Sequence, residues 1–172
     1  MVPVEAPAEI PLLNFSFAQL GKNAWALFSH VFLQLPDIFF NSIPAFGPLY
    51  HVSIPFVFVG IIVFTIQLFR EKNIEKQTQM LALWGFLVTR IWVGLITYEV
   101  NINRVNIIFY PIILLCAYGI GLAVRKWKKL WPVVAAAYGI SSILFFGTYF
   151  TTYAEESREY YNKDFMEAVA EA

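Results

Sequence analysis

The chain is poor in cysteine and in charge. Cys116 is the only cysteine among 172 residues, which excludes a disulfide framework and a cysteine-based zinc site. It lies within an apolar run and is expected to be a small core residue. Charged residues make up 14% of the chain, against roughly 25% in soluble proteins. The formal net charge of zero excludes a strongly basic nucleic-acid binder, so we expect no nucleic-acid partner.

The common signatures of soluble enzymes are also missing. The sequence has no paired metal ligands, no glycine-rich phosphate loop and no Ser–His–Asp set that can be placed. Residues 1–14 are proline-rich and acidic and lack a basic leading region, so they are not a signal peptide. We therefore expect no bound metal or cofactor, and we assign no catalytic residue to this chain.

Apolar residues dominate instead. They make up 59% of the chain, above the roughly 45–50% of soluble proteins, and the mean hydropathy is +0.61. Seventeen Phe, nine Tyr and five Trp give the high aromatic content that is typical where rings gather at bilayer surfaces. The composition predicts an integral membrane protein.

Four apolar runs account for most of this character. They lie at about 53–69, 80–98, 107–124 and 132–153. Each is close to the ~20 residues that cross a hydrocarbon core of ~30 Å as a helix. The sequence thus predicts an all-α fold, a polytopic membrane helix bundle with about four transmembrane helices at 53–153.

Small residues within these runs allow close helix contacts. Gly60, Gly85, Gly94, Gly119 and Gly121 are spread over the first three runs. In the fourth run, Gly139 and Gly147 accompany an Ala run, which predicts a packing helix.

Residues 15–35 show helical periodicity with one apolar and one polar face. The apolar face comprises Phe17, Leu20, Ala24, Leu27, Phe28, Val31 and Leu35, and the polar face comprises Gln19, Lys22, Asn23, His30 and Gln34. The polar stripe predicts a helix along the membrane surface, with His30 solvated. At the other end, 154–172 turns polar, and Tyr161, Phe165 and Val169 form a narrow stripe that predicts a second surface helix.

Between the first helix and the first span, prolines flank a Phe-Gly pair in a segment rich in aromatic side chains. Residues 15–52 therefore combine a surface helix with an ordered aromatic turn. Two interpretations stay open for the turn, a structural re-entrant segment and the lining of a substrate groove. The groove residues would be Asn41, Tyr50, His51 and Tyr98.

Basic residues predict how the chain crosses the membrane. The connections after the first and third spans hold seven Lys and Arg residues in all: Arg70, Lys72, Lys76, Arg125, Lys126, Lys128 and Lys129. By the positive-inside rule both connections are cytoplasmic. Both termini and the Arg104 loop would then be exoplasmic. Because a long exoplasmic N-terminus without a signal peptide is unusual, we expect at least one further span upstream.

The connection between the second and third spans carries one fixed positive charge, Arg104, among the amides of Asn101, Asn103 and Asn106. A guanidinium stays charged and can hold two phosphate oxygens at once. The start of the following helix also favours an anion. We predict that Arg104, with Asn103 and Asn106, binds the phosphate of a lipid-linked substrate. The alternative is an interfacial arginine that contacts ordinary lipid headgroups.

A second arginine, Arg90, lies inside the second span. Ionisable residues at that depth are costly and are functional by default. We consider Arg90 a further ligand for the same phosphate. The alternative is an ion pair with Asp37 or Glu99 from another part of the chain.

Two stretches resemble a known family. Asn41-Ser-Ile-Pro-Ala-Phe-Gly-Pro-Leu-Tyr50, followed by Ser53-Ile-Pro, and Asn101-Ile-Asn-Arg-Val-Asn-Ile-Ile-Phe-Tyr-Pro111 are similar to polytopic C-type glycosyltransferases. The nearest branch is that of the bacterial protein O-mannosyltransferases and aminoarabinose transferases. The likeness covers most of residues 15–172, and it implies a piece of the C-terminal part of the membrane domain.

The resemblance implies an activity. Such enzymes pass a sugar from a polyprenyl-phosphate carrier to an exoplasmic acceptor, and by the family's pattern Arg104 matches the arginine near the donor phosphate. The implied partners are the carrier lipid, membrane lipids and upstream transmembrane helices, in a bacterial inner membrane. The family's catalytic acidic residue lies in an early loop outside this chain, so the chain alone is expected to be inactive. The alternative is a non-enzymatic scaffold or subunit of a larger membrane complex.

Overall fold

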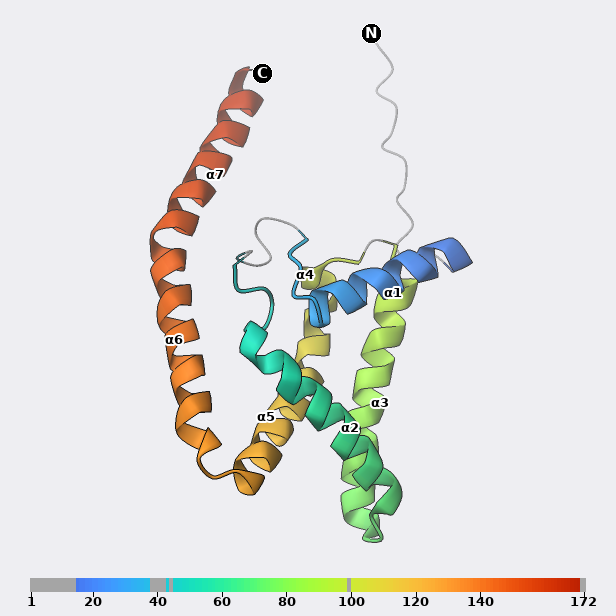
Figure 1. Ribbon diagram of the computed structural model, residues 1–172. Coiled ribbons are helices and arrows are strands. Elements are labelled where there is room, and N and C mark those ends of the chain that lie inside the picture. Colours follow the sequence, from blue (N-terminus) through green and yellow to red (C-terminus); the bar gives the residue numbers. More distant parts are fainter. Residues whose placement is uncertain (1–14, 38–42, 44, 99, 171–172) are drawn as a thin grey trace.

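The computed structural model of the protein describes residues 15–37, 43, 45–98 and 100–170, with the backbone alone at 161, 162 and 164–168. Its regular structure is helical, which confirms the all-α prediction (Figure 1). The elements are α1 (Phe17–Val31), η1 (His51–Ser53), α2 (Ile54–Arg70), α3 (Ile74–Ile96), α4 (Ile102–Val105), η2 (Asn106–Ile108), α5 (Phe109–Lys126), α6 (Leu130–Phe150) and α7 (Thr152–Ala170).

Four helices of the described part are long and apolar enough to cross a membrane, as predicted. They contain α2, α3, α5 and α6, so the chain is an integral membrane protein. α3 begins earlier than the apolar run alone indicated, because the Asn73 side chain caps it by accepting a hydrogen bond from the Lys76 backbone N–H at 3.1 Å. A polar first turn thus extends the span beyond its apolar part.

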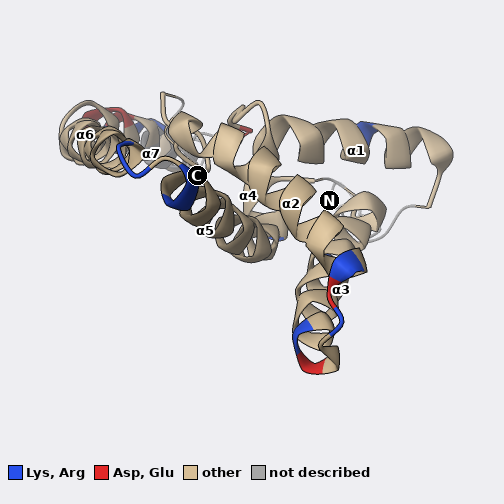
Figure 2. Cartoon of the chain, turned by 60° about the horizontal axis from the view of Figure 1, so that its bottom comes forward, with Lys and Arg blue, Asp and Glu red and all other residues tan. Residues whose placement is uncertain are grey.

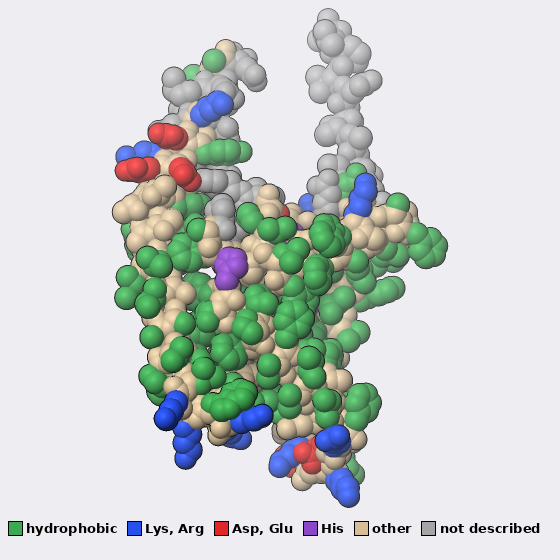
Figure 3. Space-filling view, in the orientation of Figure 1, with side chains coloured by type: hydrophobic (Ala, Val, Ile, Leu, Met, Phe, Trp, Pro, Cys, Tyr) green, Lys and Arg blue, Asp and Glu red, His purple; other side chains and the backbone are tan. Residues whose placement is uncertain are grey.

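The two basic connections lie at the same end of the bundle. Figure 1 shows the α2–α3 and α5–α6 loops together at the bottom, with α1 and α4 at the opposite end. Figure 2 shows that the positions of Lys and Arg, coloured blue, concentrate in and around those loops. On the face seen in Figure 3, a broad apolar belt separates them from the charges on α7. We call the two ends the basic end and the α1 end.

α2 and α5 cross in backbone contact through Gly60 and Gly119. A Cβ atom added at Gly60 would lie 1.9 Å from the Leu115 carbonyl oxygen, and one at Gly119 would lie 2.1 Å from the Phe56 carbonyl oxygen. The core surrounds this crossing and reaches α1 and α3. Its buried members are Leu27, Val31, Val57, Leu87, Ile102, Val105, Ile108, Phe109, Ile112, Leu115 and Cys116.

The predicted role of the fourth span as a packing helix is wrong for this chain. A Cβ atom added at Gly139 or Gly147 would meet no atom within 4 Å, and Val134 is the buried residue that α6 contributes. α6 joins α5 at the basic end and diverges from it toward the α1 end (Figure 1). Gly139 and Gly147 therefore face away from the rest of the described chain.

α1 lies across the spans, as predicted for a surface helix (Figure 1). Its predicted polar face, however, is partly buried: Asn23 is 2% exposed, His30 6% and Gln34 2%. The reason is that backbone carbonyls satisfy these side chains. Asn23 Nδ2 donates to the carbonyls of Leu95 and Thr97 at 2.7 and 2.6 Å, and His30 Nδ1 lies 2.9 Å from the Leu35 carbonyl oxygen. The predictions of a wet Asn23 and a solvated His30 are therefore wrong.

Gln34 joins the end of α1 to the aromatic turn. It adopts a left-handed backbone conformation with φ of 56°. Its Nε2 donates to the Val31 carbonyl at 2.5 Å, while its Oε1 accepts from the Leu49 backbone N–H at 2.5 Å. Gly47, with φ of 67°, lies against it. The turn therefore packs against the bundle, as both interpretations of it required.

The helix predicted at 154–172 is present as α7, which follows α6 after a break at Thr151. In Figure 1, α7 continues away from the bundle at the α1 end. Val169 is exposed, whereas the side chains of Tyr161 and Phe165 lie outside the described residues.

Candidate functional site

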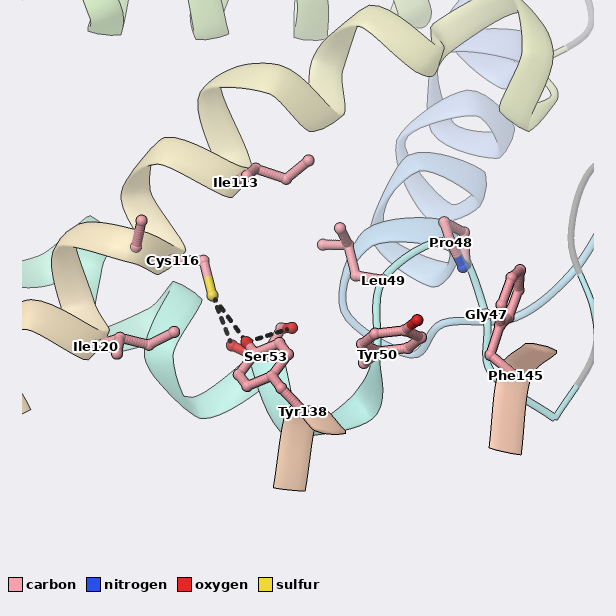
Figure 4. A pocket seen from close by; sticks show the side chains of 11 residues that line it. Gly47, Pro48, Leu49, Tyr50, Ser53, Ile113, Cys116, Ile120, Tyr138 and Phe145 are labelled. Atoms are coloured by element: carbon pink, nitrogen blue, oxygen red, sulfur yellow. Dashed lines mark hydrogen bonds between the residues drawn. The ribbon is translucent and has the colours of Figure 1, made fainter. Parts of the chain in front are cut away.

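A cavity of about 430 Å³ lies between the aromatic turn, α5 and α6. Aromatic rings of α6 and of the turn contact one another beside it: the Phe145 ring lies 5.6 Å from that of Phe46 and 6.2 Å from that of Tyr50, and Tyr50 also lies 6.2 Å from Tyr138. Figure 4 shows α5 side chains on the opposite wall. The lining residues are Gly47, Pro48, Leu49, Tyr50, Ser53, Ile113, Cys116, Ala117, Ile120, Tyr138 and Phe145.

Three polar side chains from three elements meet at this cavity (Figure 4). Ser53 Oγ and Tyr138 Oη share a hydrogen bond of 2.8 Å. Cys116 Sγ lies 3.6 Å from the Ser53 carbonyl oxygen, to which it donates, and 3.6 Å from Tyr138 Oη. Within a membrane such groups need partners in the protein, because no water is available there to form hydrogen bonds with them. This network links α5 and α6 through the start of α2.

Sequence reasoning missed Ser53 and Tyr138 and took Cys116 as an ordinary core residue. Tyr138 carries a hydroxyl near the middle of an apolar run, and Ser53 stands where the first run begins. Those positions were the available signal. They did not reveal which helices would bring the two hydroxyls together.

The Arg104 loop lies at the α1 end and is built around α4. The Asn101 side chain caps α4 by accepting a hydrogen bond from the Arg104 backbone N–H at 2.9 Å. Asp37 Oδ2 accepts a second one from the Ile102 backbone N–H at 2.5 Å. Ile102 and Val105 are buried, whereas Arg104 is exposed. The local hydrogen bonds thus fix the backbone and leave the guanidinium on the surface.

The remaining predicted site residues fall in different surroundings. Asn103 and Asn106 are exposed beside Arg104 on α4 and η2. Tyr50 lines the cavity, His51 is exposed and Tyr98 is half-buried. Asn41 lies outside the described residues.

Arg90 has no acidic partner among the residues that the structure describes. Its guanidinium carbon lies 5.2 Å from the centre of the Phe86 ring, and its Nε is buried without a hydrogen-bond partner. Asp37, one of the two partners considered, instead accepts from Ile102 at the α1 end. Glu99, the other, lies outside the described residues.

The described part of the chain holds no group of three or more His, Cys, Asp or Glu side chains placed to bind a metal ion. The chain matches no known protein family, and neither the curated proteins nor the solved structures contain a significant match to it.

Proposed function

We propose that this chain is part of a membrane glycosyltransferase that moves a sugar from a polyprenyl-phosphate carrier to an exoplasmic acceptor. In this proposal the α1 end faces the exoplasmic side of a bacterial inner membrane. The chain supplies the site for the carrier lipid, and the catalytic acid comes from a segment upstream.

One observation carries the proposal: a cavity lies further along the helix that starts beside Arg104. Ile113, on its α5 wall, follows Arg104 by nine residues, which is roughly 14 Å along a helix axis. Nine helical residues also turn through about 180°, so an amphiphile with its phosphate at Arg104 would pass around α5 to place its chain in the cavity. The aromatic and aliphatic walls suit a hydrocarbon chain.

The role of Arg104 in this proposal is electrostatic. As the sugar leaves, negative charge grows on the carrier phosphate, and a fixed guanidinium stabilises that charge through two parallel hydrogen bonds. The capped backbone of α4 fixes the position from which the Arg104 side chain extends. Asn103 and Asn106 would add neutral hydrogen bonds from the same surface.

A binding experiment tests the proposal. The chain is reconstituted in phosphatidylcholine bilayers and titrated with a polyprenyl phosphate and with the matching polyprenol. We expect the phosphate to bind more tightly, and Arg104→Gln to weaken its binding by about tenfold or more, as for a charged hydrogen bond. Lys22→Gln is the matched control, since it removes an exposed cation of α1.

The cavity has its own matched pair. Ala117→Phe reduces the cavity volume and should weaken binding, whereas Leu114→Phe alters an exposed position of α5 outside the lining. Equal binding of polyprenol and polyprenyl phosphate, or an Arg104→Gln variant that binds like the wild type, would contradict the proposal.

A second candidate function, a scaffold within a larger membrane complex, is favoured by the sparse burial of two spans. The 18-residue apolar windows of the spans that contain α3 and α6 are 11% and 6% buried within the chain. A scaffold predicts that Arg104→Gln leaves its complex intact and that no carrier lipid binds, which the same titration decides.

A further inference from the structure

Arg90 places a guanidinium near the middle of a span. α3 runs from Ile74 to Ile96, and the apolar run lies at 80–98, so the midpoints fall at 85 and 89. The guanidinium lies over Phe86, one turn toward the basic end from its own Cα. This direction is the usual one, because helical side chains point toward the helix N-terminus.

A lipid headgroup does not explain this position. The hydrocarbon core is ~30 Å thick, so its middle is roughly 15 Å from either surface. A membrane arginine that serves headgroups extends its side chain toward the nearer surface. Arg90 extends the other way, and the ring of Phe86 gives it only a cation–π contact.

The described spans cannot neutralise Arg90. α2, α5 and α6 contain no Asp or Glu. Glu75 of α3 lies fifteen residues toward the basic end, roughly 22 Å along the axis. A second copy of these spans would bring no mid-membrane carboxylate either.

The α3 surface beside Arg90 is open. Phe86 is 36% exposed and Val93 39%, and Ala82 and Thr89 are exposed on the same side. A Cβ atom added at Gly85 would meet no atom within 4 Å. The open surface is apolar apart from the Thr89 hydroxyl, which is bonded to the Gly85 carbonyl at 2.7 Å. It therefore suits contact with an apolar helix.

We propose that Arg90 is the docking point for a partner transmembrane helix that carries an Asp or Glu near the middle of the bilayer. The carboxylate would accept hydrogen bonds from the terminal nitrogens of the guanidinium. An ion pair formed there is strong because no water screens it. Pairing also lowers the free energy that each helix needs to keep its charge inside the bilayer. This inference concerns assembly and holds whether or not the chain binds a carrier lipid.

A designed peptide tests the proposal. The wild-type chain is reconstituted in phosphatidylcholine vesicles, and energy transfer reports its association with a Leu-rich transmembrane peptide that carries one central Asp. Comparison peptides have Leu at the centre, or the Asp near one end. We expect the central-Asp peptide to bind at least about tenfold more tightly than the Leu peptide.

Variants isolate the ion pair. Arg90→Leu should abolish the preference for the central Asp, and Arg70→Gln, which removes a cation from the end of α2, should keep it. Arg90→Asp should prefer a peptide with a central Arg. The proposal is wrong if central Asp and central Leu peptides bind equally, or if Asp near the peptide end binds as well as central Asp.

The depth of the site can be measured without changing Arg90. A nitroxide attached at Phe86→Cys, in a Cys116→Ala background, should be accessible to dissolved oxygen and shielded from a polar nickel complex. A label that the nickel complex reaches freely would put the guanidinium near the headgroups and overturn the inference.

Discussion

Gly60 of α2 lies directly against the Leu115 carbonyl oxygen of α5, with no room for a side chain between the two backbones. Gly119 repeats the relationship one turn further along α5, against the Phe56 carbonyl oxygen. Contacts this close let two helices pack through their backbones, as small residues do in many membrane proteins. The two glycines thus fix how α2 crosses α5, and so where the cavity-lining face of α5 points.

Gly60→Ala should strongly destabilise the fold. The new Cβ would lie 1.9 Å from a backbone oxygen, so α2 and α5 would have to separate. Overpacking typically costs about 1–3 kcal/mol, and we expect at least the upper part of that range because a backbone cannot move aside as a side chain can. Thermal unfolding in lipid nanodiscs, followed by circular dichroism, measures it. Gly121→Ala is the control, since its Cβ would meet no atom within 4 Å, and similar unfolding of the two variants would contradict the prediction.

Asn23→Ala should detach α1 from the end of α3. The Asn23 amide donates to the carbonyls of both Leu95 and Thr97, which lie at the C-terminal end of α3. Losing both bonds should cost about 1–3 kcal/mol. Faster hydrogen exchange of α1 amides is the expected signal. Asn23→Asp should be at least as damaging, because a carboxylate offers no donor to two carbonyls. Lys22→Ala, at an exposed neighbour, should leave the exchange unchanged.

Tyr138→Phe should loosen α6 and expose the single cysteine. Without the Tyr138 hydroxyl, the buried Ser53 Oγ loses its 2.8 Å hydrogen bond, at a cost of about 1–3 kcal/mol. Alkylation of Cys116 by a membrane-permeant maleimide should then become faster. Tyr138→Phe combined with Ser53→Ala should recover part of the loss, because removing both partners leaves no hydroxyl unsatisfied. Tyr149→Phe keeps its ring stack on Phe145 and serves as the control.

Gly47→Ala should disturb the aromatic turn. Its Cβ would lie 2.6 Å from the Gln34 Cβ and 2.8 Å from the Gln34 carbonyl oxygen, and φ of 67° is itself unfavourable for alanine. We expect a destabilisation of about 1–3 kcal/mol together with faster Cys116 alkylation, since the turn walls the cavity. Unchanged alkylation would show that the turn does not close the cavity.

The sequence was sufficient to predict the membrane spans but not the contacts between them. Runs of about twenty apolar residues predicted α2, α3, α5 and α6, because bilayer thickness imposes a length on each helix. The sequence did not show which glycines lie at contacts between helices. Gly60 and Gly119 make backbone contacts, whereas Gly139 and Gly147 face open space, and that difference depends on how the helices cross.

Polar residues of α1 show a second limit. A helical wheel assigns Asn23 and His30 to the wet face because their side chains are polar. In the structure they are buried, since carbonyls at helix ends and in loops accept their hydrogen bonds. Such partners lie up to 74 residues away in the sequence, as for Asn23 and Thr97, so local periodicity cannot identify them.

The guanidinium of Arg90, which has no acidic partner among the described residues, also bears on the synthesis of the protein. An arginine at the centre of a helix raises its free energy of insertion by about 2.5–3.5 kcal/mol. The span that contains α3 has a mean hydropathy of 1.5, against 2.4, 2.3 and 1.7 for those that contain α2, α5 and α6. α3 is thus the span least readily retained by the bilayer on its own. With the proposed partner helix, its carboxylate would stabilise the insertion of α3, so Arg90 would couple membrane integration to assembly.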